Sequence, residues 1–457
     1  MTISFTNTLG GDKQAFEALD PPHVRIYVCG PTVYDVPHVG HARAAVVFDV
    51  LRRHLQWRGY DVFFVRNLTD VDDKIIKRAN EDGIDAMVVA ERYARIYQDA
   101  MRRLNVLEPD LEPRASAHIP EMLELIAQLE EQGFAYAGEG SVYFAVEKFE
   151  GYGKLSGRGL DELANRERVE AAPGKLHPLD FALWKGAKPG EPSWSSPWGP
   201  GRPGWHIECS AMSERYLGRS FDIHGGGADL IFPHHENEIA QSEAAHGVGF
   251  ARYWLHNGHV NIRGEKMSKS LRNYVVIDEV LADYPPEVLR IFFAGAHYRS
   301  QIDYGPDLLE QAKAVWDGFR SFLRVSAVPD GVDDDAVATR LEAFGAAMDD
   351  DLNTPGALAA LHDLVRQGHS ALERGEHAIA SEVRAAVAAG LEILGCRAEA
   401  GGGGTDVVGP LVELLLEQRQ AARAAKDFAR ADEIRTKLAE IGVQVEDSSD
   451  GPRWFLA

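Results

Sequence analysis

The sequence predicts an α/β protein that is built on a doubly wound parallel sheet and followed by a helical region and a small C-terminal α+β unit. Three observations predict this class. Short apolar runs alternate with helical periods over residues 1–115, the alternation stops between residues 116 and 200, and the pattern after residue 330 is helical. At 457 residues the chain has room for roughly three domains.

The first half of the sheet is predicted from alternating strand and helix patterns. A buried strand, an apolar helix, a second strand and a long helix are expected at residues 25–29, 39–59, 61–65 and 86–104. Strands that alternate with helices at this spacing pair in parallel. Because ligands of such sheets bind beyond the carboxyl ends of the strands, we expect Cys29 and the segment 67–69 at a binding site.

Residues 116–200 are predicted to form an insertion between the two halves of the sheet. A helix at 121–131, a strand at 141–146 and a loop-rich stretch at 186–204 break the alternation. The second half resumes near Trp205 and ends in a hairpin-like segment at 254–262.

The C-terminal part is predicted to be helical, with a linker before the last unit. Ala- and Leu-rich helices are expected over 336–395, and Gly401–Gly404 reads as a flexible linker. Two further helices and a hairpin are expected at 410–425, 429–441 and 443–456. We therefore divide the chain at residues 1–115, 116–200, 201–265, 266–330, 331–400, 401–408 and 409–457.

Composition restricts the class of protein. The 45% hydrophobic and 26% charged content is that of a globular protein, and we see no basic, apolar leader at the N-terminus and no apolar run long enough for a membrane span. Three widely spaced cysteines argue against a disulfide framework and predict a cytoplasmic location. The net charge of −22 argues against a uniformly basic surface, but it leaves room for a local basic face.

Two motifs predict a nucleotide site. His38-Val-Gly40-His41 opens the first helix of the sheet, where free amides and the helix dipole attract phosphate and Gly40 permits close approach of a base. Two imidazoles on one helix face can donate hydrogen bonds to a phosphate that gains charge. Far downstream, Lys266-Met-Ser-Lys269-Ser can neutralise a triphosphate. In this order, the pair resembles the two signatures of class I aminoacyl-tRNA synthetases, which have a Rossmann-like catalytic domain.

Three longer segments resemble cysteinyl-tRNA synthetases over nearly the whole chain: Tyr27–Asp35, Gly204–Met212 and Asp222–Glu238. The chemistry agrees, since His234 and Glu238 stand at i and i+4, where one helix face can present both to a metal. The sequence alone leaves the neighbouring His235 open as a ligand. The resemblance implies a Zn²⁺ site, with the ligands Cys29, Cys209, His234 and Glu238.

The resemblance also implies how the substrates bind. A zinc ion can coordinate a cysteine thiolate but takes a serine hydroxyl poorly, so no separate editing domain is expected. His38, His41, Lys266 and Lys269 would be catalytic, with Mg²⁺ sharing the charge of ATP. The cysteine, ATP and adenylate pocket would be lined by Gly30, Thr32, Gly40, Asn67, Thr69, Trp205, Gly227 and Asp229, the last of these as a hydroxyl acceptor.

By the same resemblance the partners are L-cysteine, ATP and tRNA(Cys), with no membrane, and the protein would be a monomer. The segment 271–330 would contact the acceptor arm, and the helical region from residue 331 would lead to anticodon recognition. Basic residues of the last unit could meet phosphates, and Trp454 could stack on a base; a solvated helix face and a core tryptophan are the alternatives. These basic residues are Arg419, Arg423, Lys426, Arg430, Arg435 and Lys437.

Two other functions fit part of the pattern. A ligase that joins cysteine to glucosaminyl-inositol in mycothiol synthesis would share the zinc and nucleotide motifs, but it has no use for an anticodon reader. A catalytically inactive tRNA-binding relative would have no need to keep both motifs and the metal set. Cys396 is expected to be a buried structural thiol.

Overall fold

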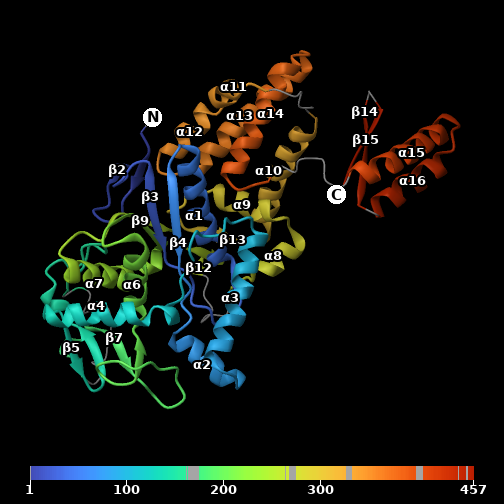
Figure 1. Cartoon of the computed structure of the whole chain (residues 1–457). Helices are drawn as coiled ribbons and strands as arrows, with labels where there is room; N and C mark the ends of the chain where they lie inside the picture. The colour runs from blue at the N-terminus through green and yellow to red at the C-terminus, as the bar shows by residue number, and fades with distance from the viewer. Residues whose placement is uncertain are drawn as a thin grey trace. The chain divides into compact units, whose positions relative to one another are not determined.

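The computed structural model describes residues 2–160, 162, 174–262, 264–266, 274–325, 332–397, 405–440, 442–448 and 451–456. The chain divides into two compact units, residues 1–397 and 398–457. Figure 1 labels their elements in chain order. Lys269 of the predicted nucleotide site lies outside the described residues.

A four-stranded parallel sheet forms the centre of the first unit. Its order is β10 (Ala251–Asn257), β9 (Phe221–Gly227), β3 (His23–Val28) and β4 (Asp61–Arg66). Every neighbouring pair is parallel, which confirms the predicted doubly wound class. Most residues of these strands are buried, as expected for a sheet that helices cover on both faces, although β9 also buries the polar side chains of Asp222 and His224.

The two halves of the sheet meet between β3 and β9. These strands come from opposite sides of the insertion, yet Tyr27 pairs with His224 and Val28 with Gly225. The helix α1 (Val39–Trp57) follows β3 in the chain and packs against β4, β9 and β10. A place where the strand order reverses leaves a crevice at the carboxyl ends of the strands, so the fold brings the segments after β3 and β9 to one binding site.

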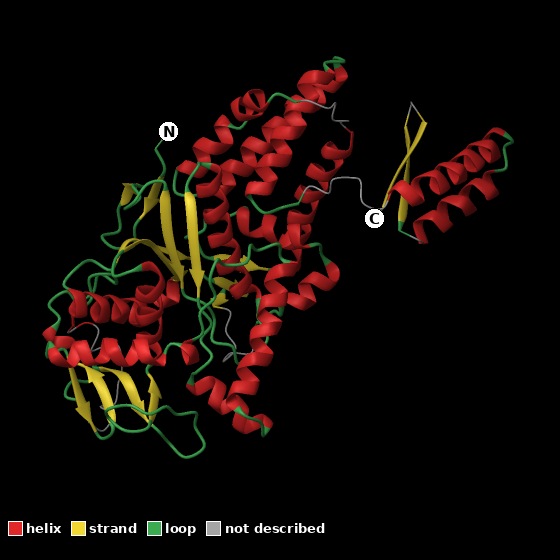
Figure 2. Ribbon diagram, in the orientation of Figure 1, coloured by secondary structure: helices red, strands yellow, loops and turns green. Residues whose placement is uncertain are grey.

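The insertion carries a small antiparallel sheet of its own. It consists of β5 (Ala135–Gly138), β6 (Ser141–Phe144), β7 (Phe181–Gly186) and β8 (Gly201–Pro203). The helix α4 (Ile119–Glu131) packs between this sheet and the helices α6 (Trp205–Leu217) and α7 (Glu236–His246) (Figure 2). The sheet ends one residue before Gly204, the N-cap of α6, so it supports the start of that helix.

The predicted hairpin at 254–262 is wrong. β10 belongs to the parallel sheet, whereas β11 (Val260–Ile262) pairs with β12 (Glu265–Lys266) and β13 (Ile302–Tyr304) in a separate three-stranded sheet. The chain crosses from one sheet to the other at Gly258, where a Cβ would overlap the carbonyl of Ser300. Only glycine permits that close passage of two backbones.

Helices make up most of the rest of the first unit. The pair α2 (Asp73–Asp82) and α3 (Ala86–Arg103) follows β4, and α8 (Ile277–Asp283) and α9 (Pro286–Ala294) precede the helical region. That region comprises α10 (Pro306–Val325), α11 (Asp334–Arg340), α12 (Glu342–Asp349), α13 (Thr354–Glu373) and α14 (His377–Ile393). Short elements complete the unit: β1 (Ser4–Thr6), β2 (Lys13–Ala15), η1 (Ala115–Ala117), η2 (Val146–Lys148), η3 (Ala228–Leu230) and η4 (Ile231–His235). Among the described residues no helix is long and apolar enough to cross a membrane.

The second unit contains the two helices and the hairpin that the sequence predicts. They are α15 (Thr405–Ala424), α16 (Phe428–Glu440), β14 (Val443–Ser448) and β15 (Gly451–Leu456). Trp454 packs against the apolar core of this unit, and Arg419 is buried. The prediction that Arg419 belongs to a basic stripe that can meet phosphates is therefore wrong, because this side chain is buried on the core side of α15. Arg423, Lys426, Arg430, Arg435 and Lys437 are exposed.

Candidate functional site

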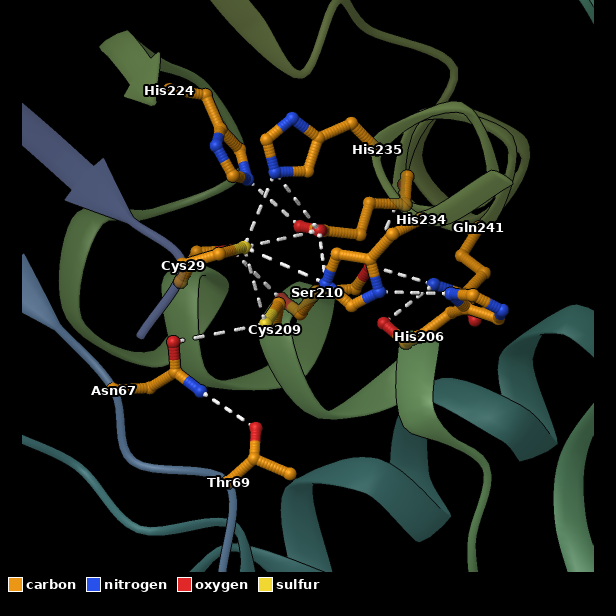
Figure 3. Close-up of polar contacts among 12 residues, drawn as sticks. Cys29, Asn67, Thr69, His206, Cys209, Ser210, His224, His234, His235 and Gln241 are labelled. Atoms are coloured by element: carbon orange, nitrogen blue, oxygen red, sulfur yellow. Dashed lines mark hydrogen bonds and ion pairs between the residues drawn. The ribbon is translucent and has the colours of Figure 1, made fainter. Parts of the chain in front are cut away.

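Four side chains from distant parts of the chain converge beyond the carboxyl end of β3. Cys29 follows that strand, Cys209 lies in α6, His234 in η4 and Glu238 in α7. Figure 3 shows both cysteines pointing toward the same centre as His234. Cys209, His234 and Glu238 are buried, whereas Cys29 is only partly covered. Cys29 is therefore the least buried of the four residues.

Of four distances between the ligand atoms, three fall in the range expected for neighbouring ligands of tetrahedral zinc, and the one between His234 and Glu238 is shorter. The Cys29 Sγ lies 3.5 Å from the Cys209 Sγ, 3.5 Å from the His234 Nε2 and 3.4 Å from the Glu238 Oε1, and His234 Nε2 lies 3.0 Å from Glu238 Oε1. Zinc bonds of about 2.0–2.3 Å at tetrahedral angles place neighbouring ligand atoms about 3.3–3.8 Å apart. Two sulfurs, one imidazole and one carboxylate are also a donor set that zinc accepts.

Burial and the close approach of these groups shift their pKa values strongly. Burial raises the pKa of the Cys29 thiol well above its ordinary value. Burial also opposes ionisation of Cys209, but a hydrogen bond from Cys29 and the neighbouring His234 outweigh it and lower the pKa of Cys209 to about 6. Although burial disfavours its charge, His234 has its pKa raised to about 10 by Glu238. Metal binding here would release the protons of Cys29 and His234.

A second histidine pair contacts the same cluster. His224 Nε2 lies 2.8 Å from Glu238 Oε2, and His235 Nε2 lies 3.3 Å from the Cys29 sulfur, so these four residues form an alternative metal-binding group. Its atoms are less evenly spaced, since His235 Nε2 is 3.9 Å from Glu238 Oε1. We interpret His224 and His235 as hydrogen-bond donors that orient the carboxylate and the thiolate, as outer-shell groups do at metal sites.

These orienting residues have partners of their own. His235 Nδ1 lies 2.8 Å from His256 Nε2, and His256 Nδ1 lies 2.8 Å from the Thr8 hydroxyl. On the other side of the cluster, His206 Nδ1 lies 3.0 Å from His234 Nδ1. The sequence motifs contained His206, His224 and His235, but no spacing rule singled them out as orienting groups. Nothing in the sequence indicated His256.

The backbone beside Cys29 is tied to the segment after β4. Gly30 N–H donates to Asn67 Oδ1 at 2.9 Å, and Asn67 Nδ2 donates to the Thr69 hydroxyl at 3.3 Å. Thr32 pairs with Thr69 in an isolated bridge. Asn67 Oδ1 also lies 3.8 Å from the Cys209 sulfur, so this corner is in contact with the metal cluster. The structure brings these predicted pocket residues together at the carboxyl edge of the sheet.

Trp205 contacts the metal cluster at His234. It is the first residue of α6 and is half-buried, and its ring centre lies 4.1 Å from that of His234. A partly exposed aromatic ring on a metal-site histidine can form one wall of a substrate pocket. The predicted position of Trp205 at the pocket fits this placement.

The two histidines of the nucleotide motif form the N-terminal cap of α1. His38 is the N-cap residue and accepts the Gly40 N–H at 3.1 Å, while the His38 N–H donates to His41 Nδ1 at 3.1 Å. Their rings stack with centres 3.8 Å apart. This cap places both imidazoles at the positive end of the helix dipole, where a phosphate is attracted.

The remaining predicted residues lie along the same edge. Gly227 ends β9, and the exposed Asp229 follows it in η3, where a Cβ on Gly227 would crowd the Asp229 carboxylate. The backbone of Lys266 ends β12, and its side chain lies outside the described part of the structure. Lys269 lies outside the described residues, and its catalytic role stays a prediction.

Comparison with known proteins establishes the class. Residues 15–314 match the family model described as tRNA synthetases class I (C) catalytic domain. Two solved structures share the fold at low sequence identity. The methionyl-tRNA synthetase of Mycobacterium tuberculosis in complex with methionyl-adenylate has a TM-score of 0.59 at 17% identity, over 81% of this chain and 89% of its own. A putative arginyl-tRNA synthetase of Campylobacter jejuni has a TM-score of 0.57 at 13% identity, over 86% and 95%. The fold and the matched domain are those of a class I aminoacyl-tRNA synthetase.

Curated relatives narrow the class to one family. Proteins named cysteine--tRNA ligase from Geobacter sulfurreducens and Thioalkalivibrio sulfidiphilus are 48% and 50% identical to the chain, each over 99% of both sequences. The same name belongs to a protein of Stutzerimonas stutzeri that is 50% identical over the full length of both. The chain belongs to the cysteine--tRNA ligase family.

Two further family models match the remaining segments. Residues 343–397 match a DALR domain, and residues 407–454 match the cysteinyl-tRNA ligase anticodon binding domain. A matched anticodon-binding unit and full-length similarity favour the synthetase over the mycothiol-pathway ligase and over an inactive relative.

Proposed function

We propose that the chain activates L-cysteine with ATP, transfers it to the terminal adenosine of tRNA(Cys), and selects its amino acid at a Zn²⁺ ion held by Cys29, Cys209, His234 and Glu238. The observation that carries this proposal is the convergence of the four ligand atoms, all within 4.8 Å of one another, at the carboxyl edge of the sheet. When bound there, zinc would accept the substrate thiolate as a ligand and leave the serine hydroxyl without an equivalent bond.

The protein groups around the cluster hold the amino acid in place. Trp205 forms one wall, and the linked side chains of Asn67 and Thr69 form the other, beside the partly exposed Cys29. Gly30 and Thr32 lie in the chain between Cys29 and α1. An amino acid whose thiol binds beside Cys29 would therefore direct its carboxylate toward the start of α1. This orientation supports attack of the carboxylate on the α-phosphate of ATP.

The nucleotide is bound by α1 and the loop after β9. His38 and His41 donate hydrogen bonds to the phosphate as it gains charge in the transition state, with the helix dipole adding to the attraction. Gly40 permits close approach of the base, and Gly227 and Asp229 receive the ribose. Lys266 and Lys269 neutralise the β- and γ-phosphates and the pyrophosphate that leaves, and Mg²⁺ bound with ATP would share this charge.

The parts beyond the catalytic residues serve the tRNA. The second unit reads the anticodon, as the name of its matching family model supports, and its exposed basic residues meet phosphates. The segment 271–330 contacts the acceptor arm, and the helical region from residue 331 leads to anticodon recognition. We place the protein in the cytoplasm as a monomer, on the reduced cysteines and on the family resemblance.

The test of this proposal is a Cys209→Ser variant. Loss of one thiolate should remove zinc from the purified protein and abolish the preference for cysteine over serine, which metal selection can raise to ~10⁴. Zinc content is measured by elemental analysis, and the preference by amino-acid-dependent ATP–pyrophosphate exchange. Cys396→Ser is the matched control, because Cys396 is equally buried but lies outside the cluster. A Cys209→Ser protein with full zinc content and full selectivity would contradict the assignment.

A further inference from the structure

Arg43 is a fully buried arginine, and its hydrogen-bond partners within the described part of the structure are backbone carbonyls. It lies in the second turn of α1, two residues after His41, and its relative exposure is 0%. One terminal nitrogen donates to the carbonyls of Gly258 and His259 at 2.8 and 2.9 Å. The other donates to the carbonyls of His297, Tyr298 and Ser300 at 3.4, 3.3 and 2.6 Å.

Burying the Arg43 guanidinium in this way costs free energy of folding. Burying a guanidinium without a carboxylate partner sacrifices hydration that carbonyl dipoles replace only in part, and burial lowers the pKa of Arg43 to about 10. A lysine or an apolar residue could fill a helix–loop contact at lower cost. The planar fork of an arginine, however, can fix two separate loops at once.

The two loops bound by Arg43 are the starts of two paired strands. His259 directly precedes β11, and Ser300 lies two residues before β13, in which Ile302 pairs with Val260. The loops cross closely, because Gly258 N–H donates to the Tyr298 carbonyl at 2.8 Å and Ile302 N–H donates to the His259 carbonyl at 3.0 Å. Arg43 therefore holds the point at which the three-stranded sheet begins.

That sheet places Lys266. Lys266 is the last residue of β12, and it pairs with Asn261, two residues after the His259 carbonyl that Arg43 binds. After the motif Lys266–Ser270, the chain forms hydrogen bonds with the start of α1. Val39 N–H donates to the Val275 carbonyl at 3.0 Å, and Ile277 N–H donates to the Pro37 carbonyl at 3.2 Å. The described segments on both sides of that sequence are thus bound to the helix that carries His38 and His41.

We propose that Arg43 is a positioning residue, which fixes the strand leading to Lys266 relative to His38 and His41. The inference rests on the proposed catalytic roles of these three residues. Arg43 contacts the carbonyls of the crossing and acts through β11 and β12 on the lysine. Its loss should therefore impair the phosphate chemistry and leave the zinc cluster, which is built on other elements, intact.

The experiment compares Arg43→Lys with Arg290→Lys in cysteine-dependent ATP–pyrophosphate exchange. Arg290 is the matched control, because it is also buried and also binds two carbonyls, those of Leu104 and Leu394, but it binds Asp49 as well and lies away from the crossing. Lysine keeps the charge and loses the fork. We expect Arg43→Lys to lower kcat by about 100-fold, as misplacement by ~1 Å can do, with KM for cysteine and zinc content unchanged. Arg290→Lys should lower the melting temperature and leave kcat unchanged.

Each outcome decides the proposal. Wild-type kcat in a folded Arg43→Lys protein overturns the proposal. The proposal is also overturned if Arg43→Lys and Arg290→Lys lose the same amount of kcat and of melting temperature. If Arg43→Lys does not fold, Gly258→Ala tests the same crossing, because its Cβ would overlap the Ser300 carbonyl and displace β11. Wild-type kcat in that variant overturns the proposal too. Absence of cysteine-dependent exchange in the wild-type protein would instead contradict the proposed function.

Discussion

Gly30 shows how closely the residues of the pocket are packed. It follows Cys29, and a Cβ at this position would overlap the carbonyl oxygen of Asn67. The Gly30 N–H is also held by the Asn67 side chain. No side chain fits here, so the two strand ends that carry the metal cluster and the pocket can approach only through a glycine.

We expect Gly30→Ala to separate these two strand ends. Overpacking of this kind costs about 1–3 kcal/mol of stability, and it should raise KM for cysteine because Cys29 and Asn67 move apart. Thermal unfolding and pyrophosphate exchange measure the two effects. Gly305→Ala is the control, since a Cβ there meets open space. Equal behaviour of the two variants would show that the contact at Gly30 is dispensable.

His256 should make stability depend on pH. It is buried between His235 and Thr8, and burial, together with His224 and Arg299, lowers its pKa from 6.5 to about 3. The folded protein keeps this imidazole neutral while the unfolded chain takes up a proton below pH 6.5. Stability should therefore fall as the pH drops from about 6.5 toward 3, by about 2 kcal/mol at pH 5 from this group alone.

A His256→Gln variant isolates this contribution. Glutamine cannot be protonated, so the melting temperature should fall less steeply between pH 7 and pH 5 than in the wild-type protein. Other titrating groups are the same in both proteins and cancel in the comparison. Identical slopes would mean that His256 is not neutral in the fold.

At the level of elements, α1 combines a structural cap with the proposed chemistry. His38 caps the helix with its own side chain, a task that Asn, Asp and Ser normally perform. We expect His38→Asn to keep the cap, and so the melting temperature, while kcat falls by about 10²–10³ through loss of the imidazole donor. His38→Ala should lose about 1 kcal/mol of stability in addition. Full activity in His38→Asn would show that His38 caps the helix and has no catalytic role.

The elements also show what the sequence could and could not predict. The helix from Val39 and the strands before Cys29 and Asn67 were predicted from their apolar patterns, with Gly30 and Pro31 after the first strand and Gly59 between the helix and the second strand. The hairpin at 254–262 was predicted wrongly because both of its runs are apolar and a glycine lies between them. Local patterning could not show that Gly258 serves a crossing with residues 297–300, and this error also hid His256.

At the scale of the whole molecule, the metal cluster depends on contacts that no local pattern contains. Cys29 and Cys209 are far apart in sequence and meet where α6, which carries Cys209, packs against β3. His234 and His235 both reach the cluster, so the i and i+4 spacing to Glu238 could favour one without excluding the other. Helix geometry left open whether His234 or His235 is the metal ligand, and the family resemblance favoured His234. The more even distances between the ligand atoms in the group with His234 support that choice.

The division of the chain into two compact units predicts that the two reactions can be separated. Every described residue of the proposed catalytic site lies within residues 1–397, whereas the second unit has an apolar core of its own around Val412, Leu438 and Val445. A chain that ends at residue 397 should therefore keep cysteine-dependent pyrophosphate exchange.

Charging of tRNA(Cys) by this shortened chain should fall, because the unit matched by the anticodon-binding model is gone. Loss of about 1.4–2.8 kcal/mol of tRNA binding corresponds to a ~10- to 100-fold drop in kcat/KM for tRNA. The measurement is transfer of labelled cysteine to tRNA alongside the exchange assay on the same preparation. Unchanged charging would assign tRNA recognition to the first unit, and loss of both reactions would show that the first unit needs the second to fold.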